Sequence, residues 1–291
     1  MKEEKFASII NNGTVNLYRG CTHGCIYCDS RSNCYGIKNF ENVTVKKDAI
    51  KQLALELKKK RVKNIIRTGS MCDPYIKLEQ ELKLTHGMLE EVYKQGFGIS
   101  LLTKSCGVLR DLELLKKINQ KTKAIVEMTI TTYNDQLCKK IEPNVSLTSE
   151  RFEALRKLNE SGIETLVWLC PILPFINDTE ENLRKILQKL KEVGTKRLIV
   201  FGFGVTLREG NREYFYKMLD KNFPGTKEKY IKAFGYSYVC NSPNSEALFK
   251  VLKEECKNLG IIYDYNAHFK YLKNFRFQAP CQQTIWQIVS D

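Results

Sequence analysis

The sequence predicts an α/β fold of six βα units with a C-terminal extension, either a partial barrel that is open on one side or an open doubly wound sheet. Six short apolar runs alternate with longer amphipathic segments along most of the chain. Such alternation is typical of parallel strands joined by right-handed crossover helices. The runs are almost continuously apolar, as expected when both faces of a sheet are covered. With 291 residues, 43% of them hydrophobic, the chain can bury one large core.

The order of the elements follows from this alternation and from helix-end signals. The predicted strands span residues 13–17, 64–68, 98–103, 124–131, 165–170 and 197–203, and the predicted helices span residues 47–60, 80–95, 109–119, 149–161 and 179–193. Thr148 and Ser149, followed by Glu150, are typical of a helix start, and Gly162 is typical of its end.

Residues 1–210 hold all six predicted βα units and are therefore predicted to form the barrel. From about residue 211 the pattern becomes irregular and rich in aromatic residues, and we predict that residues 211–291 form an extension that packs on the barrel. The N-terminus has no apolar run typical of a signal peptide. The most apolar stretch, residues 166–174, is shorter than the about 20 residues that cross a bilayer. We therefore expect a soluble cytoplasmic protein without a membrane segment.

Chemistry is expected at the carboxyl ends of the strands, as in other parallel α/β folds. Directly after the first predicted strand, Cys21, Cys25 and Cys28 have the spacing C-x3-C-x2-C within a loop of residues 18–34. A [4Fe–4S] cluster normally takes four cysteines. No fourth cysteine follows at ferredoxin spacing, so the loop predicts a cluster with one iron open to a cofactor or substrate. Gly20 and Gly24 permit a tight loop.

Other readings of the cysteines explain the pattern less well. A structural zinc site needs a fourth ligand, and His23 lies between the first two cysteines, where its reach is poor. A redox pair of Cys25 and Cys28 leaves Cys21 unexplained. Cys34 is a conceivable fourth ligand that would close the open iron. The scattered cysteines, among them Cys106 and Cys170 near strand ends, are expected to be small buried residues.

The chain is strongly basic. Lys and Arg outnumber Asp and Glu by 47 to 33, a formal net charge of +14. Such a charge can attract the phosphates of a nucleic acid. Lysine-rich helix ends and a coding bias toward lysine explain the same excess without any nucleic acid.

Several segments together resemble the DNA-repair photolyase-like branch of the radical S-adenosylmethionine (SAM) superfamily, which contains spore photoproduct lyase. Besides the cysteine loop, they are residues 68–75 with Glu79, 102–105 with 110–112, 128–132, 141–143 with Arg151, and 171–178. The resemblance covers roughly residues 14–205. It implies the partial (β/α)6 barrel of the radical SAM type, a lyase-like enzyme, and two cofactors, a [4Fe–4S] cluster and SAM.

The resemblance also implies roles for single residues. Cys21, Cys25 and Cys28 would ligate the cluster, and the amino and carboxylate groups of SAM would chelate the fourth iron. The SAM pocket would then be built by residues that match positions of the branch: Tyr27 against the adenine, Cys72 and Asp73 at the methionyl amine, Lys104 and Thr129 at the carboxylate and ribose, and Arg151 at the carboxylate. A guanidinium suits a carboxylate well.

Two positions depart from the lyase. Ser70 stands where the lyase has the cysteine that returns a hydrogen atom to the product, and Asp29 stands where it has a tyrosine. Cys72, two positions along, is a candidate hydrogen donor, and Cys72 and Lys104 are the candidate catalytic residues. These departures argue against spore photoproduct repair itself.

The sequence therefore predicts an enzyme that takes one electron from a flavodoxin- or ferredoxin-type reductant, cleaves SAM, and abstracts hydrogen from a substrate. A nucleic acid is the leading substrate candidate. Two alternatives remain: a non-catalytic, metal- or cluster-containing module that binds nucleic acid, and an electron-transfer protein that uses the cluster as a relay.

Overall fold

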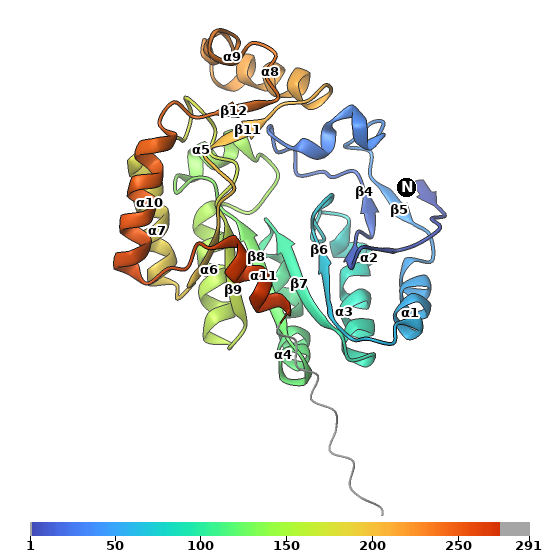
Figure 1. The fold of residues 1–291 in the computed structure, drawn as a ribbon. Helices are drawn as coiled ribbons and strands as arrows, with labels where there is room; N and C mark the ends of the chain where they lie inside the picture. The colour runs from blue at the N-terminus through green and yellow to red at the C-terminus, as the bar shows by residue number, and fades with distance from the viewer. Residues whose placement is uncertain (1, 274–291) are drawn as a thin grey trace, which may run out of the picture.

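A computed structural model describes residues 2–273 of the chain. Its centre is a seven-stranded sheet in the order β10-β9-β8-β7-β6-β3-β2 (Figure 1). All neighbours from β3 to β10 are parallel, and only β2 runs antiparallel to its neighbour. In this sheet the strands are β2 (Ile10–Asn11), β3 (Thr14–Val15), β6 (Ile65–Thr68), β7 (Gly98–Thr103), β8 (Ala124–Thr129), β9 (Glu164–Trp168) and β10 (Arg197–Ile199). Among the described residues β2 and β10 are its two edges, which confirms the predicted partial barrel.

Helices cover the outer face of this sheet. They are α1 (Ala49–Lys59), α2 (Glu79–Leu82), α3 (Leu84–Lys94), α4 (Leu112–Lys121), α5 (Asp135–Ile141), α6 (Thr148–Glu160) and α7 (Glu180–Glu192). Two short 3-10 helices form the end of the cysteine loop, η1 (Asp29–Arg31) and η2 (Asn33–Tyr35), and a third, η3 (Cys106–Asp111), follows β7. No helix between residues 2 and 273 is long and apolar enough to cross a membrane.

The two faces of the sheet have different chemistry. Successive residues of a strand point to opposite faces. In β7 and β8, Leu101 and Val126 are fully buried and belong to the main hydrophobic core. Ser100 and Glu127 alternate with them and line a chamber with residues from β3, β6 and β9. The outer face therefore packs on the helices, and the inner face encloses polar space.

Two further layers flank the carboxyl ends of the strands. A three-stranded sheet, β1 (Lys2–Glu4), β5 (Thr44–Lys46) and β4 (Tyr18–Arg19), brings the start of the cysteine loop to the barrel. Figure 1 shows a second group beyond the strand ends. It comprises β11 (Gly204–Thr206), α8 (Asn211–Asn222), α9 (Thr226–Phe234) and β12 (Val239–Asn241).

The C-terminal part is more regular than the sequence indicates. After β12 come α10 (Ser245–Leu259), which packs against α7, and α11 (Tyr265–Lys273), which contacts β10. The expected irregular extension is thus mainly helical up to residue 273, and its remaining residues, 274–291, lie outside the described part. The helix predicted over residues 80–95 is divided at Lys83, whose φ is +51°.

Candidate active site

The loop with the three closely spaced cysteines begins directly after β4, near the carboxyl ends of the barrel strands. Gly20 has a φ of +88°, and a Cβ there would lie 2.4 Å from the carbonyl oxygen of Phe40. The N–H of Cys21 donates to this oxygen at 2.9 Å. On the other side, the N–H of Ile26 donates to the carbonyl of Ile141 at 3.0 Å. The loop is therefore held from two sides, and the close approach at its start requires glycine.

All three cysteines of this loop are free thiols. Cys21 and Cys25 are buried, and Cys28 is half-buried. A hydrogen bond from Cys72 lowers the pKa of Cys21 to about 6, because it stabilises the thiolate. Burial raises the pKa of Cys25 and of Cys28. Three free thiols on one constrained loop suit three corners of a [4Fe–4S] cluster, whose usual ligands are cysteines.

Asp73 connects the cysteine loop to the ends of two barrel strands. Its Oδ1 accepts hydrogen bonds from Tyr75 N at 2.8 Å and from Thr103 Oγ1 at 2.7 Å, and its Oδ2 accepts one from Lys104 N at 2.7 Å. His23 Nε2 lies 3.1 Å from Oδ2. Burial favours the neutral acid, but the charge of His23 and these hydrogen bonds outweigh it and lower the pKa of Asp73 to about 2. A fixed carboxylate thus sets the position of the loop relative to β6 and β7.

A second buried carboxylate, Glu142, lies behind the last part of the loop. The hydroxyl of Tyr27 donates to Glu142 Oε1, and Arg151 Nη2 donates to its Oε2. The Arg151 guanidinium is fully buried, and it also donates to the carbonyls of Thr129 and Ser146, each at 2.8 Å. Burial disfavours the charged form of Glu142, but the neighbouring charge of Arg151 outweighs this effect and lowers the pKa of Glu142. The pair therefore stays ionised inside the protein and holds the Tyr27 ring in place.

A cavity of 450 Å³ opens beside the cysteine loop, a volume typical of small-molecule sites. Lys104 lines it; among residues 2–273 its Nζ has no hydrogen-bond acceptor, and the centroid of the Tyr27 ring lies 6.0 Å away. Burial opposes the charge of Lys104, but the negative charges of Cys25 and Glu142 raise its pKa. Within the described part of the chain, the cavity thus contains a cation without a hydrogen-bond acceptor. Its other walls are Cys28, Asp29, Ser30, Ser70, Trp168, Cys170, Pro171, Phe201, Gly202, Gly204, Val205, Thr206, Val239 and Asn241.

A second chamber of 210 Å³ adjoins the cavity, because Ser70 and Trp168 line both. Glu127 on β8 is 4% exposed, and it accepts hydrogen bonds from Ser100 Oγ and from the indole N–H of Trp168. Burial raises the pKa of Glu127. The Trp168 ring lies 5.4 Å from that of Phe201, measured between centroids. Glu127 thus fixes the indole that separates the two spaces.

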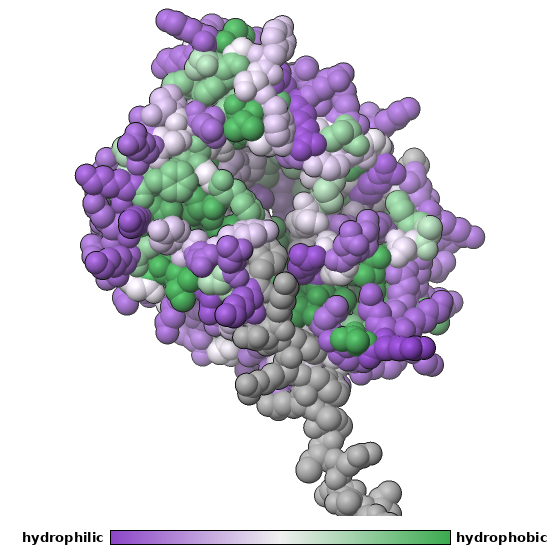
Figure 2. Space-filling view, in the orientation of Figure 1, coloured by the Kyte–Doolittle hydropathy of each residue, from purple (hydrophilic) through white to green (hydrophobic). Residues whose placement is uncertain are grey.

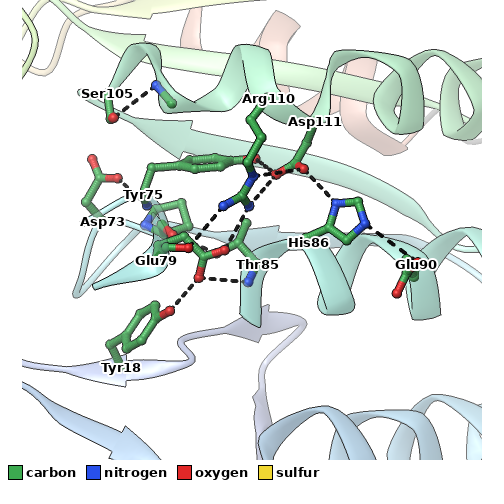
Figure 3. A network of polar contacts seen from close by, with 12 residues as sticks. Tyr18, Asp73, Tyr75, Glu79, Thr85, His86, Glu90, Ser105, Arg110 and Asp111 are labelled. Atoms are coloured by element: carbon green, nitrogen blue, oxygen red, sulfur yellow. Dashed lines mark hydrogen bonds and ion pairs between the residues drawn. The ribbon is translucent and has the colours of Figure 1, made fainter. Parts of the chain in front are cut away.

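A polar network supports the site from the side of β4 and α3 (Figure 3). Glu79 accepts a hydrogen bond from the hydroxyl of Tyr18, two residues before the loop glycine, and another from Arg110 Nη2 at 2.8 Å. Asp111 accepts from Arg110 at 2.7 Å and from the hydroxyl of Tyr75 at 2.8 Å. The network ties β4, α2 and η3 together, so it fixes the start of the cysteine loop and the segment that carries Asp73.

The structure groups the predicted site residues into two layers. Tyr27, Cys28 and Lys104 line the cavity. Asp73, Thr129 and Arg151 lie in the wall behind it, and Cys72 is a buried thiol beside Cys21, with its Sγ 3.5 Å from the carbonyl of Asp73. The prediction that Arg151 contacts SAM directly stays untested, and its complete burial favours a supporting role through Glu142.

Sequence reasoning missed several residues of the site. Trp168, Cys170 and Phe201 line the cavity, and His23 contacts Asp73. Cys170 and Phe201 both follow parallel strands, where functional side chains gather. Their positions near the carboxyl ends of predicted strands could have identified them as candidate site residues. Glu127 was given no role, although it is the one charged residue of its strand.

Comparisons with known proteins agree with this geometry. A family model described as the radical SAM superfamily matches residues 15–184. An uncharacterised protein of Methanocaldococcus jannaschii is 34% identical over 168 residues, which are 57% of this chain and 62% of that protein. The radical SAM Nα-GlyT isomerase of Pseudomonas phage M6 is 24% identical over 180 residues, 62% of this chain and 37% of that protein. This chain therefore spans less than two thirds of the length of either relative.

Among solved structures, spore photoproduct lyase complexed with dinucleoside spore photoproduct has a TM-score of 0.62 at 16% identity. The match covers 86% of this chain and 75% of that one. At this identity the likeness shows a shared fold. The family model covers more than half of the chain and includes the cysteine loop. The chain therefore belongs to the radical SAM superfamily, whose cofactors are a [4Fe–4S] cluster and S-adenosylmethionine.

Proposed function

We propose that Cys21, Cys25 and Cys28 ligate three irons of the cluster and that SAM binds the fourth through its amino and carboxylate groups. When bound and reduced, the cluster supplies the electron that cleaves SAM to methionine and a 5′-deoxyadenosyl radical. A one-electron carrier of the flavodoxin or ferredoxin type is the proposed reductant. The observation that carries this proposal is the cavity, because both Cys28 of the loop and Lys104 line it. Among the described residues the Nζ of Lys104 has no hydrogen-bond acceptor.

The proposed SAM contacts follow from the two layers of the site. Lys104 offers an ammonium group to the SAM carboxylate, and the ring of Tyr27 offers a face to the adenine. Asp73 orients the backbone of Lys104 through its 2.7 Å hydrogen bond and is the proposed partner of the methionyl amine. Thr129 is the proposed ribose contact. Arg151 acts on this pocket by holding Glu142, which in turn positions Tyr27.

We further propose that the substrate is a nucleic acid. The net charge of +14 favours a polyanion. The solved neighbour with a TM-score of 0.62 holds a dinucleoside, which supports this substrate class by analogy of fold. Ser70, which lines the cavity in this chain, has an O–H bond too strong for ready hydrogen donation. The proposed reaction is therefore a hydrogen abstraction other than spore photoproduct repair.

An aromatic rim, formed by Trp168, Phe201 and Tyr265, supports the same substrate class. The ring centroids of Phe201 lie 5.4 Å from Trp168 and 5.2 Å from Tyr265. Phe201 is 60% exposed although it lines the cavity. Hydrophobic surface gathers beside the central hollow in Figure 2. Exposed aromatic faces bind unpaired bases by stacking, and Asn241 in the same cavity can hydrogen-bond to a base edge.

Replacing Phe201 with alanine is expected to weaken binding of a single-stranded deoxythymidine oligomer about thirtyfold, the middle of the range for loss of one stacked base. The measurement is fluorescence anisotropy with the anaerobic holoenzyme. Wild-type binding should fall steeply between about 50 and 200 mM salt, because phosphate counterions return. The slope of affinity against salt should be the same for Phe201→Ala, since no phosphate contact is lost.

An oligomer of abasic sugar-phosphate units is the matched probe, because it keeps the charge and removes the bases. Phe201→Ala should bind it as the wild type does, and Phe201→Trp should retain binding of the thymidine oligomer. Equal loss on both oligomers would contradict stacking at the rim. No binding of either oligomer by the wild type at low salt would contradict the nucleic acid substrate.

A further inference from the structure

Cys170 is the thiol that faces the cavity of the proposed active site without belonging to the cysteine loop. It lies two residues after the end of β9, and among the described residues it lines the 450 Å³ cavity together with Cys28, Ser70 and Lys104. Among the described residues the Nζ of Lys104 has no hydrogen-bond acceptor, so the cavity suits an anionic ligand. Cys170 therefore lies where a bound substrate and the reacting end of SAM would meet.

The chemistry of this thiol fits hydrogen transfer. Burial raises the pKa of Cys170 to about 12, so the group keeps its hydrogen at neutral pH. An S–H bond is weaker than the C–H bonds of a substrate, whereas the O–H bond of Ser70 is stronger. Cys72, the other candidate, is buried, and its Sγ donates a hydrogen bond to the carbonyl oxygen of Asp73 at 3.5 Å.

We propose that Cys170 is the hydrogen-atom donor of the reaction. The proposal rests on the proposed function, in which a carbon radical is formed on the substrate. Hydrogen transfer to that radical forms a C–H bond, breaks the S–H bond of Cys170 and leaves a thiyl radical. One electron from the flavodoxin- or ferredoxin-type carrier and one proton from solvent then restore the thiol, so atoms and electrons balance.

The test needs no substrate. With the reconstituted holoenzyme, SAM and dithionite in D2O, the Cys170 thiol exchanges to S–D. Without substrate, the 5′-deoxyadenosyl radical should take this deuterium, because the O–D bond of water is too strong to give it up. Mass spectrometry is expected to show 5′-deoxyadenosine with one deuterium from the wild type and loss of that label in Cys170→Ala. Cys106→Ala, which alters another cysteine near a strand end, should keep the label, and Cys72→Ala is the variant that tests the other candidate donor.

The outcomes separate the two claims. No 5′-deoxyadenosine from the wild type would contradict the proposed function. Unlabelled 5′-deoxyadenosine from the wild type, or full labelling in Cys170→Ala, would contradict the role of Cys170 alone. Loss of the label only in Cys72→Ala would assign the transfer to Cys72 instead.

A second readout is independent of SAM cleavage. The pKa values of Cys170 and Cys256 are both raised by burial to about 12, but Cys256 lies enclosed in the hydrophobic core at 1% exposure. In the folded holoenzyme, iodoacetamide should therefore alkylate Cys170 faster than Cys256, as mapped by peptide mass spectrometry, and SAM should remove this difference. Equal rates without SAM would place Cys170 outside any accessible cavity and contradict its role.

Discussion

Replacement of any one of Cys21, Cys25 and Cys28 by alanine is expected to abolish the reconstituted [4Fe–4S] cluster and all cleavage of SAM. Each thiol is free, and the loop that carries them is constrained by its backbone contacts to the segments at Phe40 and Ile141. With only two protein ligands left, two of the four irons of the cluster would lack a protein ligand. Iron and sulfide analysis, with the absorption band near 400 nm typical of such clusters, measures the loss.

Cys34 provides the matched control for this experiment. It lies on η2, its side chain is exposed, and its Sγ accepts a hydrogen bond from Arg208 Nη1 at 3.4 Å. Cys34→Ala should therefore retain the cluster in full. Loss of the cluster in this variant would mean that the fourth iron is bound by the protein, which would leave no open position for SAM.

Replacement of Arg151 by methionine is expected to lower the free energy of unfolding by about 3–5 kcal/mol, because it leaves Glu142 buried without its partner. Both side chains are inaccessible to solvent in the ion pair. The hydrogen bonds to the carbonyls of Thr129 and Ser146 are lost as well. Denaturant titration of the anaerobic protein measures the change.

Arg156 on the same helix is the matched control. Its ion pairs with Glu153 and Glu160 are exposed to solvent, so Arg156→Met should cost about 0–1 kcal/mol. The double variant Arg151→Met with Glu142→Met should recover part of the loss, since it removes the unpaired charge. A raised KM for SAM in Arg151→Met without a loss of stability would contradict the supporting role and favour direct contact with the SAM carboxylate.

The sequence predicted the central fold because its strands are buried on both faces. The strand over residues 98–103 has the predicted bounds, and the parallel direction of the strands follows from the alternating pattern. The strands β1, β4 and β5 were not predicted, because each has two or three residues and pairs with distant segments. Such short strands leave no periodic signal, and their pairing is decided by tertiary contacts.

For the site, sequence spacing identified the cysteine loop but not the layer behind it. The contacts of Asp73 with His23 and Thr103 join segments far apart in the chain, and the pair of Glu142 and Arg151 joins the end of α5 to α6. No local pattern encodes such pairs. The division between residues that line the cavity and residues that support them also depends on packing, which explains why Cys170 was expected to be a structural residue.

The central claim is that the cluster has one iron open to SAM and that this iron starts radical chemistry. Electron paramagnetic resonance of the dithionite-reduced holoenzyme, recorded with and without SAM, tests it most directly when the same samples are assayed for 5′-deoxyadenosine. We predict that SAM changes the spectrum and that 5′-deoxyadenosine forms. An unchanged spectrum without nucleoside product would contradict the account and favour an electron-transfer protein or a non-catalytic module that binds nucleic acid.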